Sequence, residues 1–138
     1  MAVHTGLLRL ETAGHGAVVD LTEGVRSIVA RSGVQSGVAA VFAVGATVGI
    51  TTIEYEPGAV ADLQALLDRL IPGDGEYRHN ALNADTNAHS HLRAALIGPS
   101  ETLPVVGGEL GLGTWQQVVH VDFDDRPRER IVSVQVLS

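Results

Sequence analysis

A long β-type segment, residues 38–56, limits the folds open to this chain. It is dense in Val, Ile and Thr and contains no helix start or stop signal. β-branched side chains favour extended backbone, and the segment is longer than one average strand. We predict a central strand here, or two strands joined near Gly45. A sheet must therefore lie at the centre of the fold.

The flanking segments predict further strands and two clear helices. Residues 3–12 alternate apolar and charged side chains, which indicates a strand with one wet face. Helical spacing of apolar residues predicts one helix from Thr22, which we expect to cap it, to Gly33, and a second over residues 60–71 that stops at Pro72. Additional strands are predicted for residues 102–106, 109–112, 115–124 and 130–137, with a hairpin turn at Gly107 and Gly108.

This order of elements predicts an α+β fold. Strict alternation of strand and helix is missing, so we expect one domain over residues 1–138 with mostly antiparallel sheets and two to three helices on one side. A chain of 138 residues buries enough surface to fold without a disulfide or a structural metal.

Composition excludes several classes of function. The formal net charge of −7 argues against nucleic acid or an anionic membrane as partner. The chain has no cysteine and all its basic residues are Arg, which excludes thiolate metal sites, cysteine nucleophiles and lysine Schiff bases. No targeting segment is visible at the N-terminus, so the expected location is cytoplasmic.

A polar segment, residues 74–90, gathers the residues best suited to a site. His79, Asp85 and His89 lie within it, and His91 follows directly. Imidazole and carboxylate suit a transition metal where no thiolate exists. Since side chains two apart diverge by about 200° on a helix, a site using both His89 and His91 requires extended or irregular backbone. The alternative is a solvated loop beside a helix that begins near residue 91.

Three other sets of residues are candidates. Glu54, at the end of the central segment, is either a metal ligand or general base, or an ordinary charge at a strand end. In the stretch 111–117, Thr114 and Gln116 can contact a ligand, and we expect Trp115 to pack as a core anchor. Three alternating arginines, Arg126, Arg128 and Arg130, follow the acidic residues Asp122, Asp124 and Asp125. We expect the two sets to neutralise each other, with phosphate binding by the arginines as the lesser alternative.

Taken together, these residues form a recognisable pattern. The pattern comprises Tyr77-Arg78-His79, the run D-T-N-A-H-S-H-L-R-A-A-L-I-G-P-S over residues 85–100, L-P-V over 103–105 and L-G-T-W-Q over 112–116. Thr51, Glu54, Pro57 and residues 122–124 agree as well. The sequence resembles the YjbQ family along nearly its whole length. Members of that family are often labelled secondary thiamine-phosphate synthases.

The resemblance implies an α+β domain that forms a homotrimer, with its pocket at or close to a subunit interface. His79, Asp85 and His91 match the family's polar cluster, and His89 matches the many members that read N-A-H-x-H. Thr114 and Gln116 match its G-T-W-Q element. Two positions depart from the family: many members carry a histidine where this chain has Gly45, and an asparagine where it has Ile53.

The family label implies that a pyrimidine diphosphate is joined to a thiazole phosphate with release of pyrophosphate. Such chemistry needs positive charge near the leaving diphosphate. We expect His79, His89 and His91 to bind a divalent metal, with zinc or another transition metal favoured over magnesium. Glu54, Asp85, Thr114 and Gln116 are the expected catalytic residues. The alternatives are a non-catalytic trimeric module that binds metal or a small molecule, and a metal-assisted hydrolase.

Overall fold

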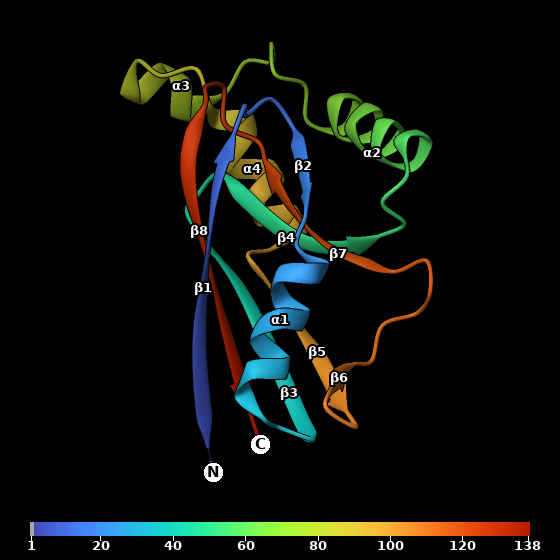
Figure 1. Ribbon diagram of the computed structural model, residues 1–138. Coiled ribbons are helices and arrows are strands. Elements are labelled where there is room, and N and C mark those ends of the chain that lie inside the picture. Colours follow the sequence, from blue (N-terminus) through green and yellow to red (C-terminus); the bar gives the residue numbers. More distant parts are fainter. Residues whose placement is uncertain (1) are drawn as a thin grey trace.

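The computed structural model describes residues 2–138 as an α+β domain with two antiparallel sheets (Figure 1). The described residues form four helices, against two to three expected. The strands are β1 (Val3–Thr12), β2 (Ala17–Asp20), β3 (Ser36–Val44), β4 (Val48–Ile53), β5 (Ser100–Val106), β6 (Glu109–Leu110), β7 (Gln117–Asp122) and β8 (Arg128–Leu137). The helices are α1 (Thr22–Ser32), α2 (Pro57–Leu70), α3 (Arg78–Asn83) and α4 (Ala88–Ile97).

The central segment divides between the two sheets. The larger sheet has the strand order β1-β8-β3-β5-β6, and the smaller has the order β2-β7-β4. β3 therefore lies in one sheet and β4 in the other, and the short connection at Gly45 carries the chain across, as the second of the two sequence interpretations expected. Val3 pairs with Leu137, so the two ends of the chain lie side by side (Figure 1).

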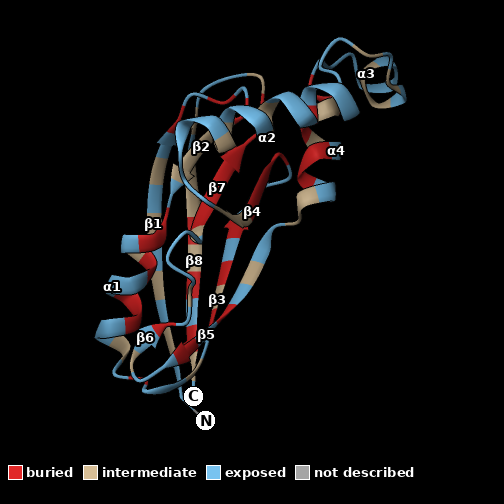
Figure 2. Cartoon of the chain, turned by 90° about the vertical axis from the view of Figure 1, so that its right-hand side faces the viewer, coloured by how far each residue is buried: buried red, intermediate tan, exposed pale blue. Residues whose placement is uncertain are grey.

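Three layers build the core. The inner face of the five-stranded sheet is covered at one end by α1 and at the other by the three-stranded sheet (Figure 1). α2 and α4 pack on the opposite face of the three-stranded sheet around Val119, Val121 and Phe123. Most of β7 and the first half of β4 are consequently buried on both faces (Figure 2). All the packed helices lie on one side of the larger sheet.

The outer face of the five-stranded sheet carries no helix. Pairing aligns its outward side chains in rows across β1, β8 and β3, for example Leu7, Ser133 and Phe42. Many of these side chains are large, apolar and exposed; the exposed members on this sheet include Val3, Leu7, Val38, Phe42, Val44 and Val106.

The helix ends show how local chemistry sets the boundaries. Helix α2 begins at Pro57, and the Glu56 carboxylate accepts hydrogen bonds from the backbone N–H groups of Gly58 and Ala59. The expectation for Thr22 was wrong, because α1 begins at Thr22 itself and Leu21 is the N-cap residue. Asp20 accepts from the Thr22 backbone N–H at 2.9 Å and from its hydroxyl at 2.6 Å.

The polar segment 74–90 is more regular than its sequence indicates. It contains the short helix α3 and the start of α4 at Ala88, three residues earlier than expected. His89 and His91 therefore lie on a helix, and the extended backbone expected there was wrong. Tertiary contacts fix the helix start: the Ala88 N–H donates to Asn80 Oδ1 at 3.0 Å, and the Ser90 hydroxyl donates to the Phe123 carbonyl. Among residues 2–138, no helix is long and apolar enough to cross a membrane.

Candidate functional site

Two of the three predicted histidines meet where α3 and α4 pack together. The rings of His79 on α3 and His91 on α4 lie edge to face with centroids 4.7 Å apart. Asp85, in the connection between the helices, places Oδ2 3.8 Å from His79 Nε2. We call His79, Asp85 and His91 the histidine cluster. It is partly exposed, so a ligand can reach it.

The backbone fixes the orientation of His91. Its Nδ1 lies 3.2 Å from the carbonyl oxygen of Ala46, in the connection between β3 and β4. A carbonyl only accepts, so Nδ1 carries the proton and donates to it. The lone pair then resides on Nε2, which is the arrangement that orients metal-ligating and general-base histidines in proteins.

A chain of amides connects His79 to the protein interior. Asn87, which is 7% exposed, donates through Nδ2 to Asp124 Oδ1 at 3.5 Å, and its Oδ1 lies 3.2 Å from His79 Nε2. Asn83 Nδ2 lies 3.3 Å from His79 Nδ1. These partners are mutually consistent only if Nε2 of His79 donates to Asn87 and Nδ1 accepts from Asn83. His79 is therefore held by hydrogen bonds at both ring nitrogens.

A buried ion network lies beneath the cluster. Arg130 contacts Asp122 at 2.7 Å and Asp124 at 3.4 Å, and Arg128 contacts Asp124 at 3.0 Å. Arg130 also donates to the Thr47 hydroxyl at 2.8 Å. The predicted neutralisation of the acidic and basic residues is thus confirmed for Arg128 and Arg130. The network joins the end of β7 to the start of β8, the two segments that support the cluster.

The carboxylates of this network stay ionised despite burial. Burial alone would raise the pKa of Asp124, but hydrogen bonds from the Asp125 backbone, Arg128 and Asn87 outweigh it and lower the pKa to about 2. Burial would also raise the pKa of Asp122. Hydrogen bonds from Arg130 and Thr12 outweigh burial, so the pKa of Asp122 lies below its usual value. The histidine cluster therefore lies above two carboxylates that are ionised at neutral pH and paired with Arg128 and Arg130.

His89 lies apart from the other two histidines. It projects from a different side of α4, toward Gly73 and the end of α2, and its Nδ1 is buried without a hydrogen-bond partner among the described residues. Burial, followed by the positive charge of Arg93, lowers the pKa of His89. The three histidines expected to bind one metal are thus divided into a pair and a single residue.

Glu54, Thr114 and Gln116 lie at the other end of the three-stranded sheet. The strand β4 separates them from the cluster, and its 6 residues extend over about 20 Å. Glu54 and Thr114 line an open groove together with Trp115. Gln116 donates to the Thr52 hydroxyl at 3.3 Å. The expectation that Trp115 is a core anchor was wrong, because its side chain is 73% exposed.

The donor set suits a transition metal in type, although it is not assembled for one. Within residues 2–138, no group of three His, Asp or Glu side chains is arranged to hold a metal ion. His91 Nε2 is available, whereas His79 must release Asn83 or Asn87 before either ring nitrogen can coordinate. In the geometry of this structure, His79, Asp85 and His91 do not form a complete set of metal ligands.

Sequence reasoning missed two supports of the cluster. The contact between His91 and the Ala46 carbonyl cannot be predicted from residue types, because every residue has a backbone carbonyl. The role of Asp122 and Asp124 as a buried base was also missed, although their placement after a strong strand gave a signal. Gly45 lies next to Ala46 with φ +152°, and a Cβ added there would come within 3.2 Å of Arg130 Nη1. A side chain at position 45 would thus lie directly beside the ion network.

Comparisons with known proteins agree with this fold. The family described as "UPF0047 protein YjbQ-like" matches residues 7–138. A UPF0047 protein of Methanothermobacter thermautotrophicus is 38% identical over 136 residues, covering 99% of this chain and 93% of the relative. A UPF0047 protein of Mycobacterium tuberculosis is 40% identical over 128 residues, covering 92% and 93%.

Solved structures show the same likeness. A YbjQ-like protein of unknown function from Sulfolobus solfataricus superimposes with a TM-score of 0.89 at 29% identity, covering 99% of both chains. A hypothetical protein from Aeropyrum pernix gives a TM-score of 0.90 at 34% identity, covering 97% of this chain and 98% of the other. With the sequence match along almost its entire length, this chain belongs to the YjbQ-like UPF0047 family.

Proposed function

We propose that this chain is a transition-metal-assisted enzyme that acts on a phosphate-bearing small molecule at the histidine cluster. One observation carries the proposal: His91 is oriented by the Ala46 carbonyl so that its Nε2 lone pair is free, beside His79 and Asp85. Thiamine-phosphate-synthase-like transfer, the reaction that the family label implies, is the first reaction to test. A metal-assisted hydrolysis is the alternative for the same site.

In this proposal the residues have distinct tasks. His91 and His79 are the nitrogen ligands and Asp85 is the oxygen ligand. When bound, the ion supplies positive charge that stabilises a leaving phosphate or diphosphate. Asn87 keeps His79 in place through its hydrogen bond, and the buried Asp124 anchors Asn87. His89 is outside this ligand set because it projects from another side of α4.

The two imidazoles favour zinc or another transition metal over magnesium. Magnesium prefers oxygen ligands in an octahedral arrangement, whereas imidazole suits zinc, nickel and copper. The chain lacks cysteine, so these histidines are its strongest ligands for a transition metal.

We extend the proposal to a homotrimer in which the groove of one copy completes the histidine cluster of another. The exposed apolar face of the five-stranded sheet supports self-association, since such a face is stabilised by burial against a second copy. A composite site would also give Glu54, Thr114 and Gln116 a role, because β4 separates them from the cluster within one chain. Glu54 is then the general base.

Measurement of the metal content tests whether the histidine cluster binds a transition metal. Untagged protein prepared without chelators or nickel resin should contain close to one transition-metal ion per chain by elemental mass spectrometry. His91→Ala should lose the ion, whereas His4→Gln, a histidine variant outside the cluster, should retain it. Metal-free wild-type protein that turns over phosphate-bearing substrates at the full rate would contradict the proposal.

Subunit mixing tests the composite site. His91→Ala and Glu54→Gln chains should each be inactive as homo-oligomers, and co-expression should restore part of the activity because some interfaces then pair two intact halves. A single chain carrying both substitutions, mixed with itself, is the control and should stay inactive. A monomer by light scattering, or a mixture with no recovered activity, would rule out the shared site.

A further inference from the structure

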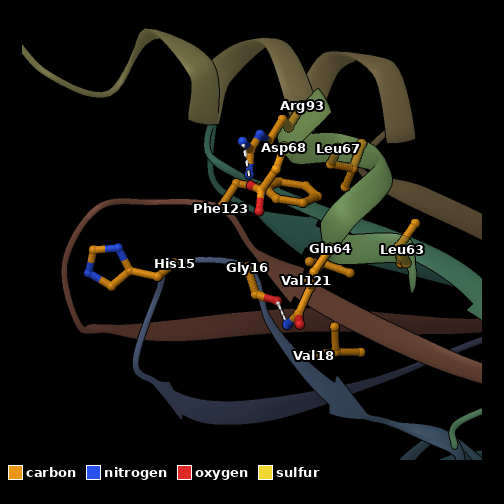
Figure 3. A pocket seen from close by; sticks show the side chains of 10 residues that line it. All are labelled: His15, Gly16, Val18, Leu63, Gln64, Leu67, Asp68, Arg93, Val121 and Phe123. Carbon is orange, nitrogen blue, oxygen red and sulfur yellow. Dashed lines mark hydrogen bonds and ion pairs between the residues drawn. The ribbon is translucent and has the colours of Figure 1, made fainter. Parts of the chain in front are cut away.

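A second pocket lies away from the histidine cluster, between α2 and the outward face of the three-stranded sheet. It encloses about 150 Å³. Figure 3 shows its lining, with Arg93 and Asp68 at one end and Gln64 near Gly16 at the other. The remaining contacts come mainly from apolar side chains on β2, α2 and β7 and after β7: Val18, Leu63, Leu67, Val121 and Phe123.

The charged end of the pocket is a buried arginine. Arg93 is 6% exposed, and its Nε and Nη2 donate to the Ile71 carbonyl at 3.0 and 2.6 Å. Its ion-pair partner is Asp68 at 3.0 Å, whose side chain is 71% exposed. Within residues 2–138, no protein oxygen accepts a hydrogen bond from Nη1. Arg93 is thus a buried guanidinium with an exposed counterion, and its Nη1 is free to donate a hydrogen bond. Such a group can bind an anion.

The opposite end offers a weaker polar contact. Gln64 donates through Nε2 to the Gly16 carbonyl at 2.8 Å, which leaves its Oε1 free to accept (Figure 3). His15 lines the edge of the pocket, but its ring is turned away from the other side chains (Figure 3). The recognition elements are therefore one fixed cation, one amide oxygen and a wall of apolar side chains, while polar atoms make up most of the exposed lining.

We infer that this pocket binds a small organic acid: a carboxylate for Arg93 on a compact apolar body for the wall formed by Phe123, Leu63 and Leu67. The volume is that of an apolar cavity that holds a benzene ring. A carboxylate matches the planar fork of the guanidinium, and it would displace the exposed Asp68 rather than a buried partner. This site is independent of the metal proposal, because none of the cluster residues lines it.

Benzoate is the probe that fits this description. Titration of full-length ¹⁵N-labelled protein should shift the amide signals of Leu63, Leu67 and Gly16 and saturate in the millimolar range. Benzamide, which has nearly the same shape without the charge, should bind at least tenfold more weakly. Inorganic phosphate, which has the charge without the apolar body, should also bind more weakly than benzoate.

Two variants test the assignment of residues. Asp68→Asn removes the competing carboxylate from an exposed position, and should tighten the benzoate dissociation constant about two- to fivefold, as the loss of an exposed ion pair predicts. Leu63→Trp should fill the pocket and abolish the shifts without touching Arg93. If Leu63→Trp does not fold, Asp68→Asn decides the question by itself.

Three outcomes would overturn the inference. Absence of shifts at the pocket would show that it takes no ligand of this class. Equal binding of benzamide would reduce it to an apolar cavity without anion recognition. Unchanged benzoate affinity in Asp68→Asn would remove Arg93 from the site. Because the metal content of these variants is measured separately, failure here leaves the histidine cluster untouched.

Discussion

The two ends of the three-stranded sheet differ in how far a single chain organises them. At the histidine cluster, both ring nitrogens of His79 and Nδ1 of His91 have hydrogen-bond partners, and the buried carboxylates of Asp122 and Asp124 lie beneath. At the groove, Trp115 is 73% exposed and Gln116 makes only surface contacts. Buried, paired charges hold side chains in one geometry, whereas exposed ones remain mobile. Hydrogen bonds within one chain therefore orient the two histidine rings of the cluster, whereas the side chains of the groove lack such buried contacts.

The largest effect on stability is expected from breaking the ion network beneath the histidine cluster. Arg130→Ala leaves the fully buried Asp122 without its partner, which should lower the free energy of unfolding by about 3–5 kcal/mol. Urea denaturation measures this change. Arg126→Ala, a substitution at an exposed arginine close by in sequence, is the control and should change stability little. Equal effects of the two substitutions would mean that the ion network does not support the fold.

His120, in the middle of β7, should make the protein less stable in acid. Burial lowers the pKa of His120 from 6.5 to about 4, and neither ring nitrogen has a partner among residues 2–138. Above pH 6.5 the residue is neutral in both states. As the pH falls from 6.5 to 4, the unfolded chain takes up a proton that the folded chain refuses, which costs about 3 kcal/mol.

His120→Leu isolates this contribution. The variant should be at least as stable as wild type at pH 7.5, since an unpartnered buried imidazole is replaced by an apolar side chain of similar volume. Its stability should fall less between pH 6.5 and 4. The acid loss that remains below pH 4 belongs to Asp122 and Asp124, whose pKa values are lowered and whose stabilisation disappears on protonation. Parallel curves for the two proteins would assign the whole acid transition to other groups.

Substitution of Asn87, whose amide links His79 to Asp124, should have an intermediate effect on stability. Asn87→Ala removes both the contact to His79 and the one to Asp124, and should lower the free energy of unfolding by about 1–3 kcal/mol. Thermal unfolding compared with Asn83→Ala, whose side chain is exposed, checks the prediction. If Asn83→Ala costs as much, then the buried position of Asn87 gives it no special importance.

The smallest effect on stability is expected at the groove. Trp115→Ala should change the free energy of unfolding by less than about 0.5 kcal/mol, because the side chain is mostly exposed in the single chain. If the groove is instead completed by a second copy, the substitution should weaken the oligomer, which sedimentation at decreasing protein concentration reveals. A large loss of stability in a monomer would show that Trp115 packs within its own chain.

The regular elements were readable from the sequence because their signals are local. The strand at residues 3–12 appears as predicted, and the division of residues 38–56 at Gly45 agrees with one of the two interpretations of that segment. The glycine pair at Gly107 and Gly108 forms the predicted hairpin between β5 and β6. Hydrophobic periodicity and turn-forming residues are patterns of a few neighbouring residues, so they can be recognised without knowledge of the rest of the fold.

The polar segment was misread because its structure depends on distant partners. α3 has 6 residues and no buried side chain, so it leaves no hydrophobic period to detect. The start of α4 is fixed by Asn80 and by the carbonyl of Phe123, which a local pattern does not contain. The helix in turn separates His89 from His91, a result that decides which residues can share a ligand.

By itself, the sequence determined the α+β class, most strand and helix positions, the absence of thiolate chemistry and the residues from which a site can be built. Which of those residues meet depends on the folded structure. It brought His79, Asp85 and His91 together, separated His89, and placed Glu54 and Thr114 at the far end of β4. The physical reason is that local propensity sets the direction of the backbone, whereas proximity between distant residues depends on how the layers pack.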